Sequence, residues 1–230
     1  VLVVMGGAPY HEPTLSKIIQ WGGGKKAKVL VVAWGSFDVE DSWDYTQDVF
    51  SEFEPTWIKL APMDMPREKR KFLKLLNEAT VVFFTGGRQY GHIEVVEEAG
   101  VRQALQKRYQ EGAVFAGSSA GAAIMSENMF TGARGFETTI DPEQVEVCKG
   151  LGLVSNVIFD QHFITRSERY NRMYSYLTTS QERMGVGVES EAAVAIEDGK
   201  HVEVIGNGKA MTFIKTQRPQ QYIVSIFEPG

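Results

Sequence analysis

The residues best suited to chemistry lie in the segment Val114–Met125, where a serine stands between two glycines. Its sequence, VFAGSSAGAAIM, is expected to form a buried strand, a sharp turn and the start of a helix. The spacing Gly117-x-Ser119-x-Gly121 is typical of a turn that presents a nucleophilic serine, because only small flanking residues permit so tight a bend. The helix N-terminus behind Ser119 favours developing negative charge. The segment predicts a serine that attacks a carbonyl carbon, although such residues also occur where a helix simply packs closely on a sheet.

A second glycine-rich loop, TGGRQ at residues 85–89, follows an expected strand that ends at Phe84. Two adjacent glycines allow the backbone to approach a ligand with its N–H groups facing it. The backbone N–H groups of Gly87 and Ala120 are therefore expected to form an oxyanion hole. The simpler interpretation of the loop is a plain turn into the next helix.

A general base is expected in the segment DQHF, residues 160–163, after the expected strand Val157–Phe159. The chain has four histidines, and only His162 directly follows a strand and has polar neighbours. A base of this type also needs a group that orients its imidazole ring. Spacing does not choose among the available acids, which are Glu127, Glu137, Asp141, Glu143, Glu146 and Asp160 before the histidine, and Glu189 and Glu191 after it.

Three arginines follow His162 at helical spacing, at positions 166, 169 and 172. On a helix they would share roughly one face, which could recognise the carboxylates of an acidic substrate. The alternative is a solvated helix face, which the neighbouring Glu168 favours.

Composition and charge exclude several other classes of function. The net charge is −5, and the densest basic run, Arg67–Lys71, fits the solvated side of an amphipathic helix, so no nucleic-acid partner is expected. No apolar run has membrane-spanning length, and no metal, dinucleotide or P-loop motif occurs, so neither a membrane partner nor a cofactor is expected. The lone cysteine, Cys148, favours a reducing, cytoplasmic compartment, while a start without methionine leaves room for a removed secretion signal.

The elements that must position these residues alternate between strand and helix. This pattern predicts an α/β fold: a doubly wound, mostly parallel sheet with flanking helices and an antiparallel C-terminal extension, all in one domain over residues 1–230. Asn207-Gly208 is expected to turn a hairpin between the last two strands. Loops at the carboxyl ends of parallel strands converge, so the three segments above should meet. The expected strands are 1–5, 28–33, 57–60, 80–84, 113–117, 157–159, 185–188, 193–196, 201–204 and 210–214, and the expected helices are 11–21, 39–53, 67–78, 91–99, 101–110 and 120–126.

Taken together, the motifs resemble those of the cyanophycinases, which belong with peptidase E in one serine peptidase family. The likeness rests on FTGGxQ at 84–89, GSSAGA at 117–122, DQHF at 160–163 and GVGV at 185–188, and it spans nearly the whole chain. It implies a sheet fold like that of class I glutamine amidotransferases, with serine in place of the nucleophilic cysteine. It also implies a peptide substrate and a tendency to form homodimers.

Carried over to this chain, the resemblance implies Ser119 as nucleophile, His162 as base and Glu137 as the acid of the triad. It implies a substrate pocket lined by Gln89, Asp160, Gln161 and Arg166. Arg172 of the arginine series and Arg88 of the glycine-rich loop are further candidates for contact with the substrate. The implied reaction is cleavage of cyanophycin, an arginine-decorated poly-aspartate, to β-aspartyl-arginine. The alternatives are a dipeptidase for α- or β-aspartyl peptides, and an idle binding protein of the same fold.

The chain departs from the family pattern in three places. Arg88 stands where the family commonly has Asp, and a positive charge beside the pocket would disfavour an arginine-bearing substrate. The arginine-rich stretch after DQHF is one residue longer, and Glu189-Ser190-Glu191 replaces the usual Asp-Glu. These differences bear on the substrate and leave the expected reaction type unchanged.

Overall fold

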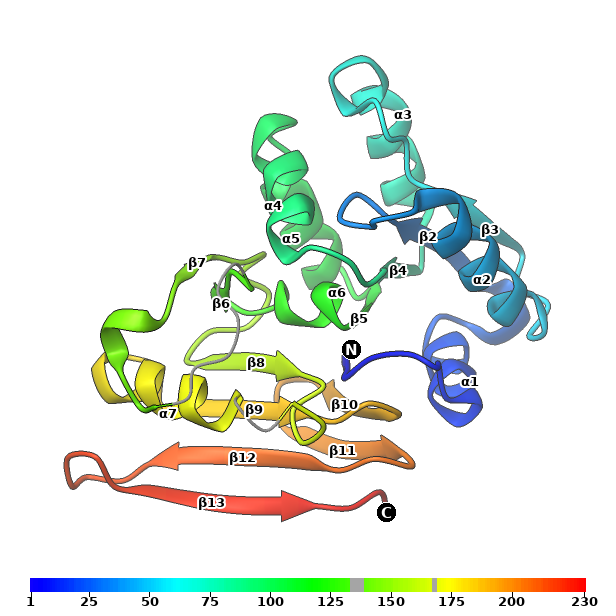
Figure 1. Cartoon of the computed structure of the whole chain (residues 1–230). Helices are drawn as coiled ribbons and strands as arrows, with labels where there is room; N and C mark the ends of the chain where they lie inside the picture. Colours follow the sequence, from blue (N-terminus) through cyan, green and yellow to red (C-terminus); the bar gives the residue numbers. More distant parts are fainter. Residues whose placement is uncertain (133–138, 167–168) are drawn as a thin grey trace.

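A seven-stranded sheet, ordered β11-β10-β1-β5-β4-β2-β3, forms the centre of the computed structural model, which describes residues 1–132, 139–166 and 169–230. Its five parallel strands are flanked on one edge by the antiparallel β10 and β11 (Figure 1). The strands are β1 (Leu2–Met5), β2 (Lys28–Val32), β3 (Trp57–Leu60), β4 (Val81–Phe84), β5 (Val114–Ser118), β10 (Ala192–Glu197) and β11 (His201–Gly206). The predicted α/β class with a mostly parallel sheet is confirmed.

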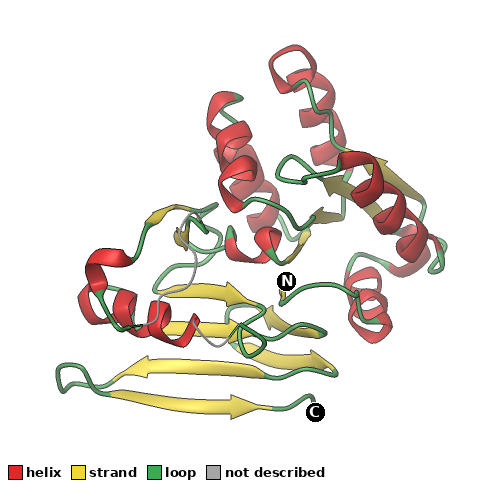
Figure 2. Ribbon diagram, viewed as in Figure 1, coloured by secondary structure: helices red, strands yellow, loops and turns green. Residues whose placement is uncertain are grey.

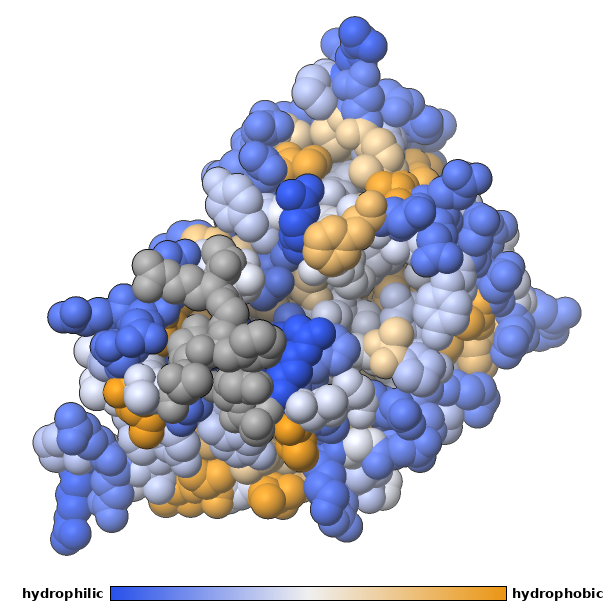
Figure 3. Space-filling view, in the orientation of Figure 1, coloured by the Kyte–Doolittle hydropathy of each residue, from blue (hydrophilic) through white to orange (hydrophobic). Residues whose placement is uncertain are grey.

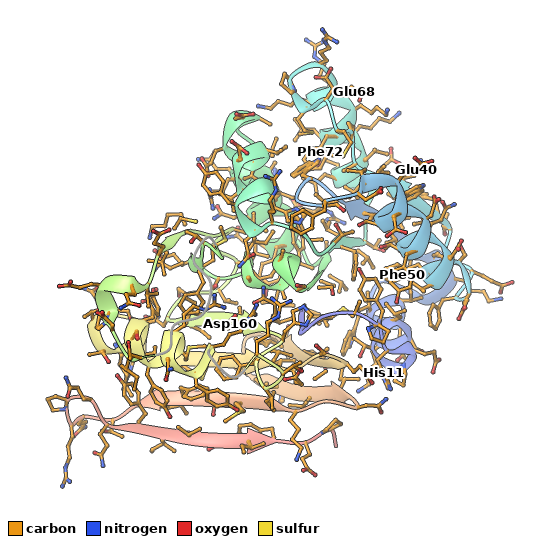
Figure 4. The ribbon with its side chains drawn as sticks, in the orientation of Figure 1. His11, Glu40, Phe50, Glu68, Phe72 and Asp160 are labelled. Atoms are coloured by element: carbon orange, nitrogen blue, oxygen red, sulfur yellow. The ribbon has the colours of Figure 1, made fainter. Side chains whose placement is uncertain are left out.

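Helices cover both faces of this sheet because side chains alternate along each buried strand. On β1, Val3 and Met5 pack with α1 (Glu12–Trp21) and α2 (Val39–Ser51), while Leu2 and Val4 face the opposite core. That core contains apolar side chains of α3 (Met65–Glu78), α4 (Gln89–Glu98), α5 (Arg102–Gln110) and α6 (Ala120–Ala123). Figure 2 shows the helices and the strands in different colours. Figure 4 labels Phe50 of α2 and Phe72 of α3, whose aromatic side chains are buried.

A second sheet, ordered β13-β12-β9-β8, lies beside the first. Its strands are β8 (Val157–Gln161), β9 (Met184–Val188), β12 (Ala210–Lys215) and β13 (Tyr222–Phe227), and α7 (Arg169–Thr179) packs on it through Met173, Tyr176 and Leu177. Short elements complete the described chain: β6 (Asn128–Phe130) paired with β7 (Val147–Lys149), and the 3₁₀ helices Gly24–Lys26 and Pro142–Gln144. Apolar side chains of β8 and β9 join the same buried cluster as those of β1, so the two sheets share a core.

Two predictions about the C-terminal part are wrong. The antiparallel extension is not one continuation of the main sheet, because only β10 and β11 join it while β9 and β12 belong to the second sheet. Asn207-Gly208 does not turn a hairpin, because the strands on either side of it, β11 and β12, pair with β10 and with β9 and β13 respectively. The choice of strand partner depends on distant residues, which a local sequence pattern does not show.

The last two strands leave apolar side chains at the surface, and Ile223, Ile226 and Phe227 of β13 are exposed. Apolar residues gather along the lower edge of the space-filling view, over β12 and β13, while the tips of the helical end are hydrophilic, with apolar residues between them (Figure 3). No helix in the described ranges is both long and apolar enough to cross a bilayer.

Candidate active site

The turn after β5 holds Ser119 in a strained backbone conformation, with φ 52° and ψ −113°. The two glycines of the motif make the turn possible. A Cβ on Gly117 would lie 2.2 Å from the carbonyl oxygen of Gly121, and a Cβ on Gly121 would lie 2.3 Å from that of Phe84. Since a non-glycine residue at positive φ costs on the order of 1–3 kcal/mol, the surrounding packing must hold Ser119 in place. The predicted strand–turn–helix geometry is therefore present.

The imidazole of His162 contacts the side chain of Ser119. Nε2 lies 3.0 Å from the Ser119 Oγ, within hydrogen-bond distance. The other ring nitrogen, Nδ1, lies 2.7 Å from the Ser190 Oγ. When Nδ1 carries the proton, Nε2 is free to accept the serine proton, which is the arrangement that activates a serine nucleophile.

The segment after β1 supports both residues from one side. The backbone N–H of Ser119 donates to the Met5 carbonyl oxygen at 3.0 Å, and that of His162 donates to the next carbonyl, Gly6, at the same distance. Gly7 lies directly against the imidazole, since a Cβ at that position would be 2.0 Å from Cε1 of His162. The tip of β1 thus ties the second sheet to the nucleophile turn of the first.

A pocket of about 400 Å³ opens over Ser119 and His162. Its walls come from the carboxyl ends of several strands, as predicted for a parallel sheet. The described residues that line it are Ala8 and Tyr10 after β1, Ser36, Phe37, Asp38, Asp41, Ser42 and Tyr45 after β2, Gly86 and Gly87 after β4, and Ser118 beside the nucleophile. Sequence reasoning placed the loops after β4, β5 and β8 here but missed the contributions of the loops after β1 and β2.

Within the described ranges, the backbone N–H groups of Gly86, Gly87 and Ala120 donate to no backbone carbonyl. Gly86 lies close to the serine, since a Cβ on it would be 3.6 Å from the Ser119 Cβ. Gly87 has a φ of 124°, which favours glycine, and a side chain there would meet the Gly35 carbonyl oxygen at 2.1 Å. The loop thus places free donors near the nucleophile.

The chain is similar to known proteins in both sequence and fold. The sequence model of peptidase family S51 matches residues 2–204. The chain belongs to peptidase family S51. It is a serine-type peptidase with the cyanophycinases among its relatives.

Among curated relatives, the cyanophycinase of Geminocystis herdmanii is 27% identical over 213 residues, covering 90% of this chain and 78% of that protein. The cyanophycinase of Trichormus variabilis is 34% identical over 134 residues, covering 58% of this chain and 44% of that protein. A crystal structure of a peptidase from an acI-B1 Actinobacterium superposes with a TM-score of 0.72 at 18% identity, over 98% of this chain and 96% of that one. The structure of a putative peptidase E from Listeria monocytogenes EGD-e superposes with a TM-score of 0.66 at 16% identity, over 89% of this chain and 97% of that one. At such identities, the solved structures show the shared fold.

Burial lowers the pKa of His162 in this S51 peptidase to about 4, and the positive charges of Arg166 and Arg169 contribute to the lowering. Glu189 and Asp160 act in the opposite direction but do not outweigh these effects. The imidazole is therefore neutral near pH 7 and can accept a proton.

The expected acid of the triad, Glu137, lies outside the described residues. Of the alternatives, Glu189 and Glu191 flank Ser190, the residue that contacts Nδ1. The Glu189 carboxylate binds elsewhere. It accepts hydrogen bonds from the backbone N–H groups of Ile164, Thr165 and Ser190, and from the Thr165 hydroxyl. Burial disfavours its charged form, yet these hydrogen bonds outweigh burial and lower the pKa of Glu189. Ser190, which contacts the imidazole, was missed because a serine in a turn carries no distinctive sequence signal.

Asp160 and Arg172, both expected in the substrate pocket, instead form a buried ion pair. The Asp160 side chain is fully buried on β8 (Figure 4), and the Arg172 Nη2 lies 2.6 Å from its Oδ1. Arg169 also donates to Asp160, at 3.0 Å, and to the Gln161 side chain, at 2.7 Å. These charges are satisfied inside the protein, so the arrangement supports positioning of the DQHF segment rather than direct substrate contact. A carboxylate at the end of a fully buried strand was the signal that a cationic partner was needed.

The other expected substrate residues lie in three different settings. Gln89 is buried, and its Nε2 donates to the Phe130 carbonyl oxygen at 3.3 Å. Arg166 is exposed on the loop after His162. Arg88 is also exposed, and it is not among the described residues that line the pocket. The argument that Arg88 would repel an arginine-bearing substrate therefore loses its structural basis.

Proposed function

We propose that this S51 peptidase is a cyanophycinase-like hydrolase that releases β-aspartyl-arginine from an arginine-decorated aspartate polymer. The observation that carries the catalytic part is the 3.0 Å contact between the Ser119 Oγ and the His162 Nε2, at a strained turn inside a pocket. The curated relatives are cyanophycinases, which supports the substrate class.

The proposed reaction proceeds through an acyl-enzyme. The Ser119 Oγ attacks the scissile carbonyl carbon while its proton passes to the His162 Nε2. The backbone N–H groups of Gly87 and Ala120 donate hydrogen bonds to the resulting oxyanion. The intermediate collapses, the C–N bond breaks, and the amine leaves with the proton from Nε2. A water molecule then gives its proton to Nε2 and attacks the ester, and the returning proton frees Ser119.

The charge of the pocket favours a basic substrate. Its described lining includes two carboxylates, Asp38 and Asp41, and neither lysine nor arginine. The aromatic side chains of Phe37 and Tyr45 line the same pocket. Carboxylates bind a guanidinium through charge-assisted hydrogen bonds, and aromatic rings attract it through cation–π contacts. An aspartyl dipeptide without arginine offers no guanidinium, so this lining favours arginine-bearing substrates such as the polymer.

Replacing both pocket carboxylates tests this assignment. Asn at position 38 can still cap α2, where the Asp38 side chain accepts a hydrogen bond from the Asp41 N–H at 3.0 Å. We expect the variant Asp38→Asn/Asp41→Asn to raise KM for cyanophycin about tenfold, as loss of a charge-assisted contact predicts. Asp44→Asn is the matched control, since Asp44 lies on the same helix but outside the pocket lining. An unchanged KM, or a faster rate on β-aspartyl dipeptides than on the polymer, would overturn the substrate assignment.

Reaction with a fluorophosphonate separates an enzyme from an idle binding protein. The wild type should be labelled at Ser119, as mass spectrometry of the digested protein can locate, whereas Ser119→Ala should not. Loss of a triad member typically costs several orders of magnitude in kcat. Hydrolysis by Ser119→Ala within about tenfold of the wild-type rate would rule out this residue as the nucleophile.

A further inference from the structure

We propose that Ser190, a neutral residue, is the group that orients His162, in the place where a serine peptidase usually has a carboxylate. The proposal rests on the function assigned above and deepens it. Its basis is the 2.7 Å contact between the Ser190 Oγ and the His162 Nδ1, on the side of the ring opposite Ser119.

The geometry gives Nδ1 a partner of the right kind. An imidazole with its proton on Nδ1 has a single donor there, and the Ser190 oxygen lies at the distance of a strong hydrogen bond. With the proton on Nδ1 and the Ser190 oxygen accepting it, Nε2 faces Ser119 without a proton, as the base must. The proton stays on Nδ1 throughout, so Ser190 positions the imidazole and takes no part in proton transfer.

Glu189 acts one step further from the imidazole. One of its oxygens accepts a hydrogen bond from the Ser190 backbone N–H at 2.7 Å, and the other accepts one from the Thr165 N–H at 2.7 Å. The carboxylate therefore fastens the Ser190 turn to the loop that begins with His162. This explains why a partly buried acid lies next to the catalytic histidine while its hydrogen bonds go to the backbone around it.

Because Ser190 is neutral, it stabilises a positively charged His162 less than a carboxylate would. A carboxylate on Nδ1 would stabilise the imidazolium formed during catalysis by a full opposite charge, whereas a hydroxyl offers only a dipole. The charged groups that influence His162 are Arg166 and Arg169, with Glu189 and Asp160 acting in the opposite sense. A carboxylate introduced at position 190 should therefore raise the pKa of His162.

The test combines ¹⁵N NMR of the histidine ring with kinetics on the full chain. His162→Gln assigns the ring signals among the four histidines. In the wild type we expect Nδ1 protonated and Nε2 bare, and Ser190→Ala should move the ring toward the other tautomer. The same variant should lower kcat about 10- to 100-fold with little change in KM, as a misplaced base predicts. Ser190→Thr keeps the hydroxyl and should restore both readouts, while Ser190→Asp should raise the pKa of His162 by about one to three units.

Two further variants, each of which removes a nearby carboxylate, serve as controls for Ser190→Ala. Glu191→Gln removes a charge from the same turn, at an exposed position, and should leave the ring signals as in the wild type. Glu137→Gln should also leave them unchanged. Wild-type signals and kcat in Ser190→Ala, or a tautomer change in Glu137→Gln, would overturn the role of Ser190. Failure of fluorophosphonate to label the wild type would instead reject the proposed function, since the NMR readout does not depend on turnover.

Discussion

Gly7 gives the sharpest test of how the catalytic pair is held, because the imidazole packs directly on it. A Cβ at this position would lie 2.0 Å from Cε1 of His162 and 2.7 Å from both ring nitrogens. Carbon atoms in contact normally stay about 3.5–4.0 Å apart. In Gly7→Ala the ring must therefore move by about 1.5 Å, which restores a normal carbon–carbon contact between the new methyl group and Cε1. Such a shift takes Nε2 beyond hydrogen-bond reach of Ser119, from its present 3.0 Å.

The size of the effect follows from this displacement. A misplacement of about 1 Å can cost roughly 100-fold in rate, and complete loss of the base costs several orders of magnitude. We expect Gly7→Ala to reduce kcat/KM about 100- to 10,000-fold, which equals about 3–5 kcal/mol of transition-state stabilisation. Stability should change much less, because His162 is only partly buried and its ring can swing toward the pocket.

The assay is the rate of fluorophosphonate labelling at Ser119, measured beside the release of β-aspartyl-arginine and the melting temperature. Gly86→Ala is the comparison, since its Cβ would make only an ordinary contact, 3.6 Å from the Ser119 Cβ. That variant should stay within about tenfold of the wild type, as an uncrowded methyl group predicts. Labelling of Gly7→Ala at the wild-type rate, with an unchanged melting temperature, would refute the reasoning.

Three further predictions concern titratable groups. The pKa of His162 is lowered to about 4, so kcat/KM should fall on the acid side of its pH profile only as the pH drops through about 4. Arg166→Gln removes a positive charge that lowers this pKa, so it should move the acid-side fall to higher pH. A fall near pH 6.5, the ordinary histidine value, in both proteins would contradict this. Burial lowers the pKa of the fully buried His92 from 6.5 to about 4. Between these two pH values the unfolded chain binds a proton that the folded protein does not. The free energy of unfolding should therefore drop by about 3 kcal/mol as the pH falls from about 6.5 to about 4. His92→Gln should remove that part of the pH dependence in urea titrations from about pH 7 down to about pH 4, and equal slopes in both proteins would argue against it. Asp160→Asn should lower the free energy of unfolding by about 3–5 kcal/mol, because it leaves the Arg172 guanidinium buried without a counter-charge, whereas a loss under about 1 kcal/mol would show that the pair is not structural.

The parts of the site that could be predicted from sequence are those whose geometry is fixed locally. A serine between two glycines, after an apolar run and before a helix, admits few backbone paths. The structure accordingly shows the strained turn at Ser119 where the motif predicts it. The position of His162 at a strand end was also readable, although its strand belongs to the second sheet. Convergence of strand ends brought the two residues together regardless of that difference.

The parts that could not be predicted depend on contacts between distant segments. The arginine series after His162 fitted either a substrate-binding face or a solvated one, yet Arg172 is buried against Asp160, which lies on a different element. Helical spacing shows which residues share a face, but not what that face meets. The last strand, Tyr222–Phe227, was missed although its β-branched and aromatic residues are typical of a strand, and it pairs with β12.

The residues at the tip of β1 carry no reactive group, yet they hold the backbones of both Ser119 and His162. Consecutive carbonyls of Met5 and Gly6 accept the backbone N–H groups of Ser119 and His162, each at 3.0 Å. Both acceptors lie on one short segment, so these two bonds bring the backbones of Ser119 and His162 together there. Both residues have positive φ, and each strained backbone makes one of these bonds. Chemistry in this fold is thus positioned by backbone groups that a search for reactive side chains passes over.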